Sequence, residues 1–244
     1  AFEKCMTSRP GDSLSGKEAV CVHATVNKWL DTNEFLMGRL QKKQQAQAGQ
    51  EIDPANTLYW RMPLRRLESE SIRDSLLAAG DRLNLQLGGP AVMLRTEADG
   101  RISIDQQRLG RSSDQWRRSV YLLTRRGYHH TLLDVFDQPG IETTCSQRQV
   151  NAVALQSLAM LNDQFVFDQA ASLASLLSRE VPDPAKRIQQ AYLRILCRPP
   201  LPAELTACLA SLDDLQHQDG LESTAAFAEI CHTLLNTSEF LYRE

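Results

Sequence analysis

The sequence predicts a mainly α-helical protein with a small β-hairpin or irregular insertion near residues 90–125. Apolar residues recur at helical spacing along most of the chain, and residues typical of helix starts and stops bracket these stretches. Turn-forming residues gather in the one stretch where this spacing fails. With 244 residues, 42% of them hydrophobic, the chain is long enough to bury a substantial core.

The first part of the chain predicts an N-terminal helical segment over residues 1–50. One helix is expected over 15–30. Asp31, with Glu34 three residues later, forms a capping box that opens a second helix, which ends near Gly49. Two prolines then predict a loop over 53–64, at the start of a main domain that extends to residue 244.

The middle of the chain predicts one helix followed by the insertion. The helix covers Leu67–Ala79 and stops at Gly80. The segments 91–96 and 101–105 flank the turn dipeptide Asp99-Gly100, which is typical of a hairpin. Residues 120–122 fit either a strand or a short helix, and this alternative stays open.

The last third carries the strongest helical spacing. Asn162 or Asp163 is expected to cap one helix, and Asp183 followed by proline at the first helical position opens another. The predicted helices cover about 149–161, 163–179, 184–196, 202–216 and 221–235.

Charge is unevenly distributed along the chain. The net charge of −3 argues against a dedicated nucleic-acid binder. Residues 61–130 nevertheless hold 13 basic and 8 acidic side chains, while residues 131–244 hold 7 and 15. This asymmetry favours docking of the two halves on each other over binding of an anionic partner. No apolar run approaches the roughly 20 residues that span a bilayer, so no membrane span is expected.

The six cysteines follow no CxxC or CxxCH pattern. The sequence therefore predicts neither a metal site nor covalent haem attachment. Cys5 and Cys21 are compatible with a disulfide, although their spacing does not decide it. Cys197, Cys208 and Cys231 fall in helical stretches and are expected to be small buried residues.

Charged residues close to apolar core positions form a candidate polar network. We expect either a salt-bridged exposed face or a semi-buried network that positions the segment 117–163. In the second case Arg66, Glu70 and Arg73 would pair with carboxylates of residues 137–163. The candidate network comprises Arg65, Arg66, Glu68, Glu70, Arg73, Asp74, Arg117 and Arg118.

A turn-rich stretch and the helix after it form a candidate ligand loop. Its two carboxylates, Asp137 and Glu142, have the chemistry for acid–base work or for holding a hard cation. Capping of the loop backbone by Asp137 is the favoured alternative. The candidate residues are Asp137, Glu142, Arg148, Asn151, Gln156, Asn162 and Asp163.

At these residues the chain resembles a bacterial family best known from planctomycetes, a domain of unknown function found C-terminal to c-type cytochrome domains. The resemblance covers about residues 53–244. It departs from the family pattern after Asn151, where Asn and Gln156 are kept but an intervening Thr-Pro is lost. It rests on Arg65–Glu70, Ile72-Arg73-Asp74, Gly88-Gly89-Pro90, Arg117–Tyr121, Phe136-Asp137, Cys145, Gln156, Leu161-Asn162-Asp163, Arg198-Pro199-Pro200, Asn236 and Glu239–Tyr242.

The resemblance implies a fragment of a larger exported protein, periplasmic or at the cell surface. Haem is then expected only in upstream cytochrome-type domains, which would be partners of this part, and polysaccharide is a candidate ligand. The favoured function is a non-catalytic interaction or ligand-binding module. The alternative is a hydrolytic or redox-linked enzyme acting on extracellular polysaccharide, with its site near residues 117–163 and built around Arg118, His129, Asp137 and Glu142.

Overall fold

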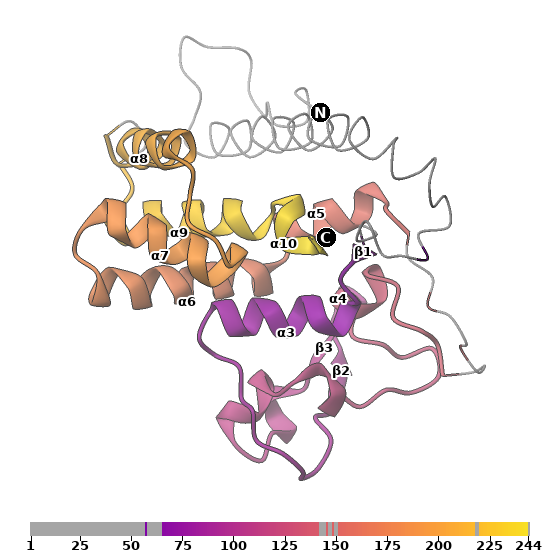
Figure 1. Cartoon of the computed structure of the whole chain (residues 1–244). Helices are drawn as coiled ribbons and strands as arrows, with labels where there is room; N and C mark the ends of the chain where they lie inside the picture. Colours follow the sequence, from indigo (N-terminus) through magenta and orange to yellow (C-terminus); the bar gives the residue numbers. More distant parts are fainter. Residues whose placement is uncertain are drawn as a thin grey trace, which may run out of the picture.

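The computed structural model describes residues 57, 65–141, 145, 148, 151–217 and 220–243. Within them the protein is mainly helical and carries two short antiparallel strand pairs, which confirms the predicted fold class (Figure 1). The helices expected over 15–30 and 31–48, the loop over 53–64 apart from residue 57, and Glu142 lie outside the described residues. In the part that is described, no helix combines the length and apolarity that crossing a bilayer requires.

Four helices form the main helical layer. Helix α6 (Gln164–Glu180) packs along α9 (Ser223–Leu235), and α7 (Pro184–Leu196) and α8 (Pro202–His217) pack beside them. The apolar residues of α6 recur on one face, which is buried. The rings of Phe167 and His232 stack between α6 and α9 with their centroids 4.0 Å apart.

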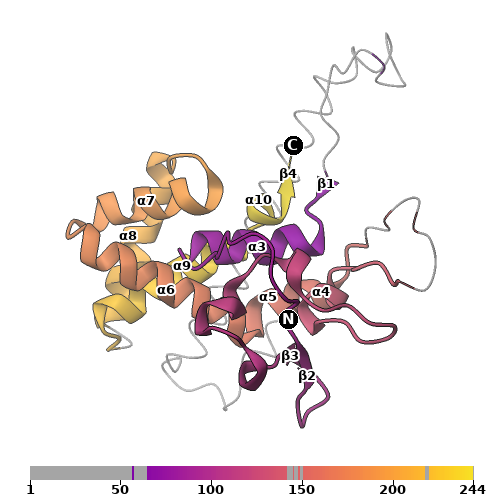
Figure 2. The same ribbon diagram turned by 90° about the horizontal axis from the view of Figure 1, so that it is seen from below.

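Helix α3 (Ser69–Ala79) lies between this layer and residues 81–130 (Figures 1 and 2). Its Ile72 and Leu76 are fully buried in the main core. It ends at Gly80, as predicted. A Cβ atom at Gly80 would lie 2.9 Å from Oε1 and 3.2 Å from the carbonyl oxygen of Gln169, so the absence of a side chain lets α3 end directly against α6.

Residues 81–130 form a lobe on the other side of α3. The predicted hairpin is present as β2 (Leu94–Thr96) and β3 (Ile102–Ile104), paired across the expected turn. Three 3₁₀ turns follow, η1 (Gln106–Arg108), η2 (Ser112–Trp116) and η3 (Ser119–Tyr121). The open alternative at 120–122 is thus decided for a short helical turn. A second, small core of Val92, Leu122 and Leu133 holds the lobe together.

Two short helices connect the lobe to the main layer, α4 (Thr131–Val135) and α5 (Ala154–Asn162). The prediction that the second of these begins near residue 149 was wrong. Residues 151–153 precede the helix as an irregular segment, and Asn151 is engaged in contacts with Arg66 and Asp137. Asp163 caps α6 by accepting from the amide of Phe165.

The C-terminal end of the described chain lies beside the strand that precedes α3. Strand β1 (Arg65–Arg66) pairs with β4 (Tyr242–Arg243), which follows the short helix α10 (Ser238–Leu241). The sequence did not predict this pair, because two residues are too few for a recognisable strand pattern.

The expectation that all three helical cysteines are buried was wrong for Cys197. Cys231 is fully buried and Cys208 is half-buried, but Cys197 is exposed. Cys197 stands just after the last residue of α7, in a left-handed conformation with φ of 57°. It therefore ends the helix instead of packing within it.

Candidate functional site

Arg66 is the centre of the first half of the predicted polar network. Strand β1 places its side chain inside the molecule, where it is only 2% exposed. The guanidinium donates to the carbonyl oxygens of Phe136 and Asn151 and to Oδ2 of Asp137, at 2.7 Å. It also lies over the Phe136 ring, 5.5 Å from its centroid. One buried arginine thus ties the first strand to the turn after α4 and to the segment before α5.

The Asp137 side chain is fixed by hydrogen bonds from three different residues. Its carboxylate accepts four hydrogen bonds, from Arg66, from the amide and side chain of Asn151, and from Gln156. Its backbone is left-handed, with φ of 61°, a conformation that aspartate tolerates better than most residues. Partial burial opposes ionisation, but the hydrogen bonds from Arg66 and Asn151 outweigh it and hold the pKa of Asp137 below its usual value.

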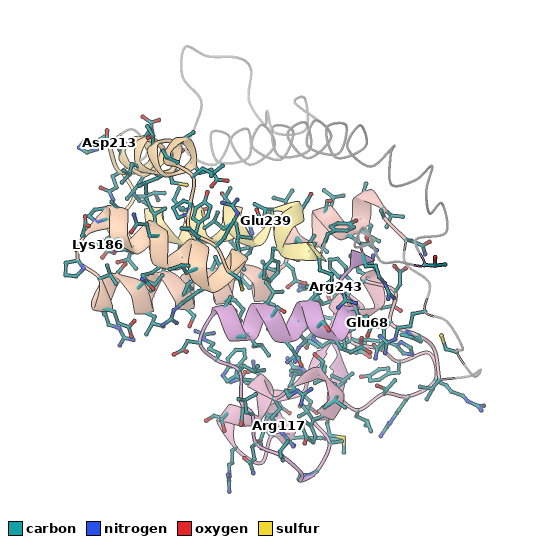
Figure 3. The ribbon with its side chains drawn as sticks, viewed as in Figure 1. Glu68, Arg117, Lys186, Asp213, Glu239 and Arg243 are labelled. Atoms are coloured by element: carbon teal, nitrogen blue, oxygen red, sulfur yellow. The ribbon has the colours of Figure 1, made fainter. Side chains whose placement is uncertain are left out.

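Glu70 and Arg148 form a second connection between α3 and the candidate ligand loop. Two parallel hydrogen bonds of 2.6 and 3.1 Å join their side chains, and Glu68 lies 3.4 Å from the same guanidinium. Ser69 also donates to Glu70. Burial raises the pKa of Glu70, but the hydrogen bond from Arg148 and the other donors outweigh it, so the pKa is lowered overall. Figure 3 shows Glu68, which directly precedes the first residue of α3.

Arg73 does not pair with carboxylates of residues 137–163, contrary to the prediction. Its fully buried guanidinium donates to the carbonyl oxygens of Gln115 and Arg117 and to the hydroxyl of Ser119. Asp74, its neighbour on α3, accepts from both the amide and the hydroxyl of Ser119, each at 2.7 Å. Burial lowers the pKa of Arg73 to about 10. The lobe is therefore fastened to α3 through its backbone.

Arg117, like Arg73, binds backbone carbonyl oxygens, but within the lobe (Figure 3). Its guanidinium donates to the carbonyl oxygens of Gly88 and Pro90 and lies over the Tyr121 ring, 3.7 Å from the centroid. Gly88 and Gly89 both have positive φ, which makes the tight turn that offers these carbonyls.

The remaining predicted residues make contacts only within their own segment or lie away from the Arg66–Asp137 cluster. Asn162 donates to the carbonyl of Leu158 one turn earlier in α5, and Asp163 caps α6. Arg118 is half exposed, with Asp74 at 3.8 Å. Arg65 is exposed on β1. The structure thus brings Arg66, Asp137, Asn151 and Gln156 into one cluster and leaves Asn162 and Arg118 outside it.

The two histidines that precede α4 are partly buried. His129 and His130 each have a buried Nδ1 atom without a hydrogen-bond partner in the described structure. Burial, with a smaller contribution from the charge of Arg73, lowers the pKa of His130 to about 3. This ring is therefore neutral at physiological pH. Among the described residues, no group of three or more His, Cys, Asp or Glu side chains is arranged to hold a metal ion.

The sequence did not predict two features on the side of α3 that faces α7 and α10. An open cavity of about 480 Å³ lies between α3, the end of α7, α10 and β4, and is lined by both signs of charge, including Arg194, Arg243 and Glu239. Beside it, Arg198 makes paired hydrogen bonds to both Glu204 and Glu239. One indication of this pairing was present in the sequence: Arg198 and Glu239 are both among the residues on which the family resemblance rests.

Comparison with known proteins gives different results for the two ends of the chain. Residues 1–42 match the model of the Tim10/DDP family zinc finger. Over 45 residues the chain is 38% identical to the putative mitochondrial import inner membrane translocase subunit Tim8 A-B of Mus musculus, a match that covers 18% of this chain and 45% of the mouse protein. No solved structure matches the chain. Residues 39–212 match the PSD1 family model, and the chain therefore belongs to this family of proteins of unknown function (DUF1553).

Proposed function

We propose that this chain is a non-catalytic interaction module of a larger exported protein that carries cytochrome-type domains upstream. The family resemblance supplies this context, and the PSD1 family model matches most of the chain. The module binds either a partner domain of the same protein or an extracellular polysaccharide.

The observation that carries the proposal is the complete engagement of Asp137. A carboxylate has about four lone-pair sites, and Asp137 accepts four hydrogen bonds from protein groups. A general base or nucleophile needs an open lone pair that faces the substrate. Asp137 instead has the geometry of a group that fixes the loop against Arg66. The polar cluster thereby keeps three separate segments in one rigid arrangement.

Ligand-dependent melting of the whole chain, combined with a turnover assay, tests the proposal. The ligands are the purified upstream domains and alginate, an anionic polysaccharide. A ligand at a hundred times its dissociation constant adds about 2.7 kcal/mol to the free energy of unfolding, so the melting temperature should rise with one of them. We expect no turnover of glycan or ester substrates. Turnover that disappears in Asp137→Asn while the fold stays intact would make the protein an enzyme instead.

A further inference from the structure

The lobe exposes three large apolar side chains in neighbouring segments. Leu85, Leu87 and Val120 are 67%, 78% and 71% exposed. Large apolar side chains that are exposed together mark interaction sites more often than single exposed ones do. We call Leu85, Leu87 and Val120 the apolar lobe surface.

The two segments that carry this surface run alongside each other. Asn84 forms a parallel bridge with Arg117, and Val92 forms another with Leu122. Between these bridges the Arg117 side chain holds the carbonyls of Gly88 and Pro90. Leu85 and Leu87 therefore stand on backbone that is fixed at both ends, so the surface is preformed.

The backbone amides of Leu85 and Leu87 are available to pair with another chain. The amide of Asn84 donates to the carbonyl of Trp116, and the amide of Gln86 donates to the side chain of Asn84. The amides of Leu85 and Leu87 make no hydrogen bond within the described part of the chain. Leu85 and Leu87 lie outside the named strands, but their unpaired amides, two residues apart beside the isolated bridge at Asn84, can pair with another extended segment.

Two arginines lie beside the segment that carries Leu85 and Leu87. The Arg111 guanidinium contacts Gln86 at 3.4 Å, and Arg82 lies over the Trp116 ring at 4.9 Å. Residues 106–126 contain a single acidic residue, Asp114, and six arginines, of which Arg117 is buried against the carbonyls of Gly88 and Pro90. An apolar centre with an arginine-rich border is typical of a protein interface, and its charge selects an acidic partner.

We propose that the apolar lobe surface binds an acidic, extended peptide segment by strand addition. The peptide backbone pairs with the free amides of Leu85 and Leu87, its apolar side chains contact Leu87 and Val120, and its carboxylates meet the arginines. This inference rests on the proposed interaction role and names the surface and the chemistry of its partner. A polysaccharide satisfies the arginines but offers neither strand pairing nor alternating apolar side chains.

The test uses a capped, fluorescein-labelled peptide of eight residues in which glutamate and valine alternate. Fluorescence anisotropy with the whole chain should show saturable binding that weakens as salt is raised. We expect Leu87→Ser and Arg111→Glu each to weaken binding by about tenfold or more, as for residues central to an interface. The matched controls are Leu201→Ser, at a leucine 61% exposed beyond α7, and Arg179→Glu, at an exposed arginine of α6. Both controls should bind like the unmodified protein.

A second peptide, N-methylated at alternate amides, isolates the strand pairing. Its binding should be lost, and equal binding of the two peptides would overturn strand addition. The surface assignment also fails if the control variants weaken binding as much as the lobe variants. It fails as well if alginate alone binds there, or if sedimentation shows only self-association through this face. Failure of the peptide while the upstream domains still raise the melting temperature would refute this surface and leave the interaction role standing.

Discussion

Arg66 and Asp137 form an ion pair of 2.7 Å although 71 positions separate them in the sequence. The arginine is buried, whereas the carboxylate retains 21% of its exposure. Because the same arginine also holds two backbone carbonyls, the pair fixes the path of the chain at the end of α4.

Replacing Asp137 with asparagine tests the contribution of this pair. Asparagine tolerates the left-handed backbone, so the change removes the charge and leaves the turn unstrained. We expect the free energy of unfolding to fall by about 1.5–3 kcal/mol, the usual contribution of a hydrogen bond to a charged group. Urea denaturation measures it. The control is Asp134→Asn, at an exposed residue of α4, and an equal loss in both variants would contradict the assignment.

Glu70 and Arg73 should contribute independently. Arg73→Met leaves buried carbonyls without a donor, each at a cost of about 1–3 kcal/mol, so a loss of at least about 2 kcal/mol is expected. Glu70→Gln weakens a partly exposed pair and should cost about 0–1 kcal/mol. Since the two side chains bind different segments, the double variant should be additive within about 0.5 kcal/mol. Coupling above that value, measured in a double-mutant cycle, would place them in one network after all.

His130 should make the fold sensitive to mild acid. The unfolded chain protonates this histidine near pH 6.5, whereas burial keeps the folded form neutral down to about pH 3. The unfolded state therefore binds an extra proton in this window, and stability falls with decreasing pH by up to about 1.4 kcal/mol per unit. Burial also lowers the pKa of His232, which adds to the slope.

Urea denaturation across pH 4.5–7 tests this expectation. The pH slope should decrease in His130→Asn and persist in His217→Asn, whose ring is exposed. Below the usual carboxylate pKa, stability should fall further, because Asp137 and Glu70 have lowered pKa values when folded. An unchanged slope in His130→Asn would mean that its ring accepts a proton within the fold.

The turn at Gly88 gives a test of the lobe alone. Its φ of 72° disfavours any residue with a Cβ, although the space around it is empty to 4 Å. Gly88→Ala should therefore cost about 1–2 kcal/mol through backbone strain. Gly140 is also unobstructed but has no positive φ, so Gly140→Ala should change the free energy by less than about 0.5 kcal/mol. Thermal melting compares the two, and equal stability would mean that the turn at Gly88 can relax.

The helices could be predicted from the sequence because their signals are local. Gly80 and Asp163 stand at the ends that they were expected to mark. The hairpin around Asp99-Gly100 followed from its turn residues. The strand pair of Arg66 with Tyr242 had no such signal, since it depends on two distant segments meeting.

The candidate site was predictable only where side chains pair with side chains. Opposite charges in the sequence suggested that Arg66 would meet a carboxylate of the 137–163 segment, and it contacts Asp137. Nothing in the sequence indicated that Arg73 and Arg117 would hold backbone carbonyls, because every residue offers that acceptor.

The strand pair β1–β4 also determines how the fold responds to mechanical force. Arg65 stands opposite Arg243, so the chain enters and leaves the ladder at the same end. A pull applied at residues 65 and 243 loads these hydrogen bonds one after another, as in a zipper, instead of shearing them together. We therefore expect tension to detach the two strands at low force before the helical layer is strained.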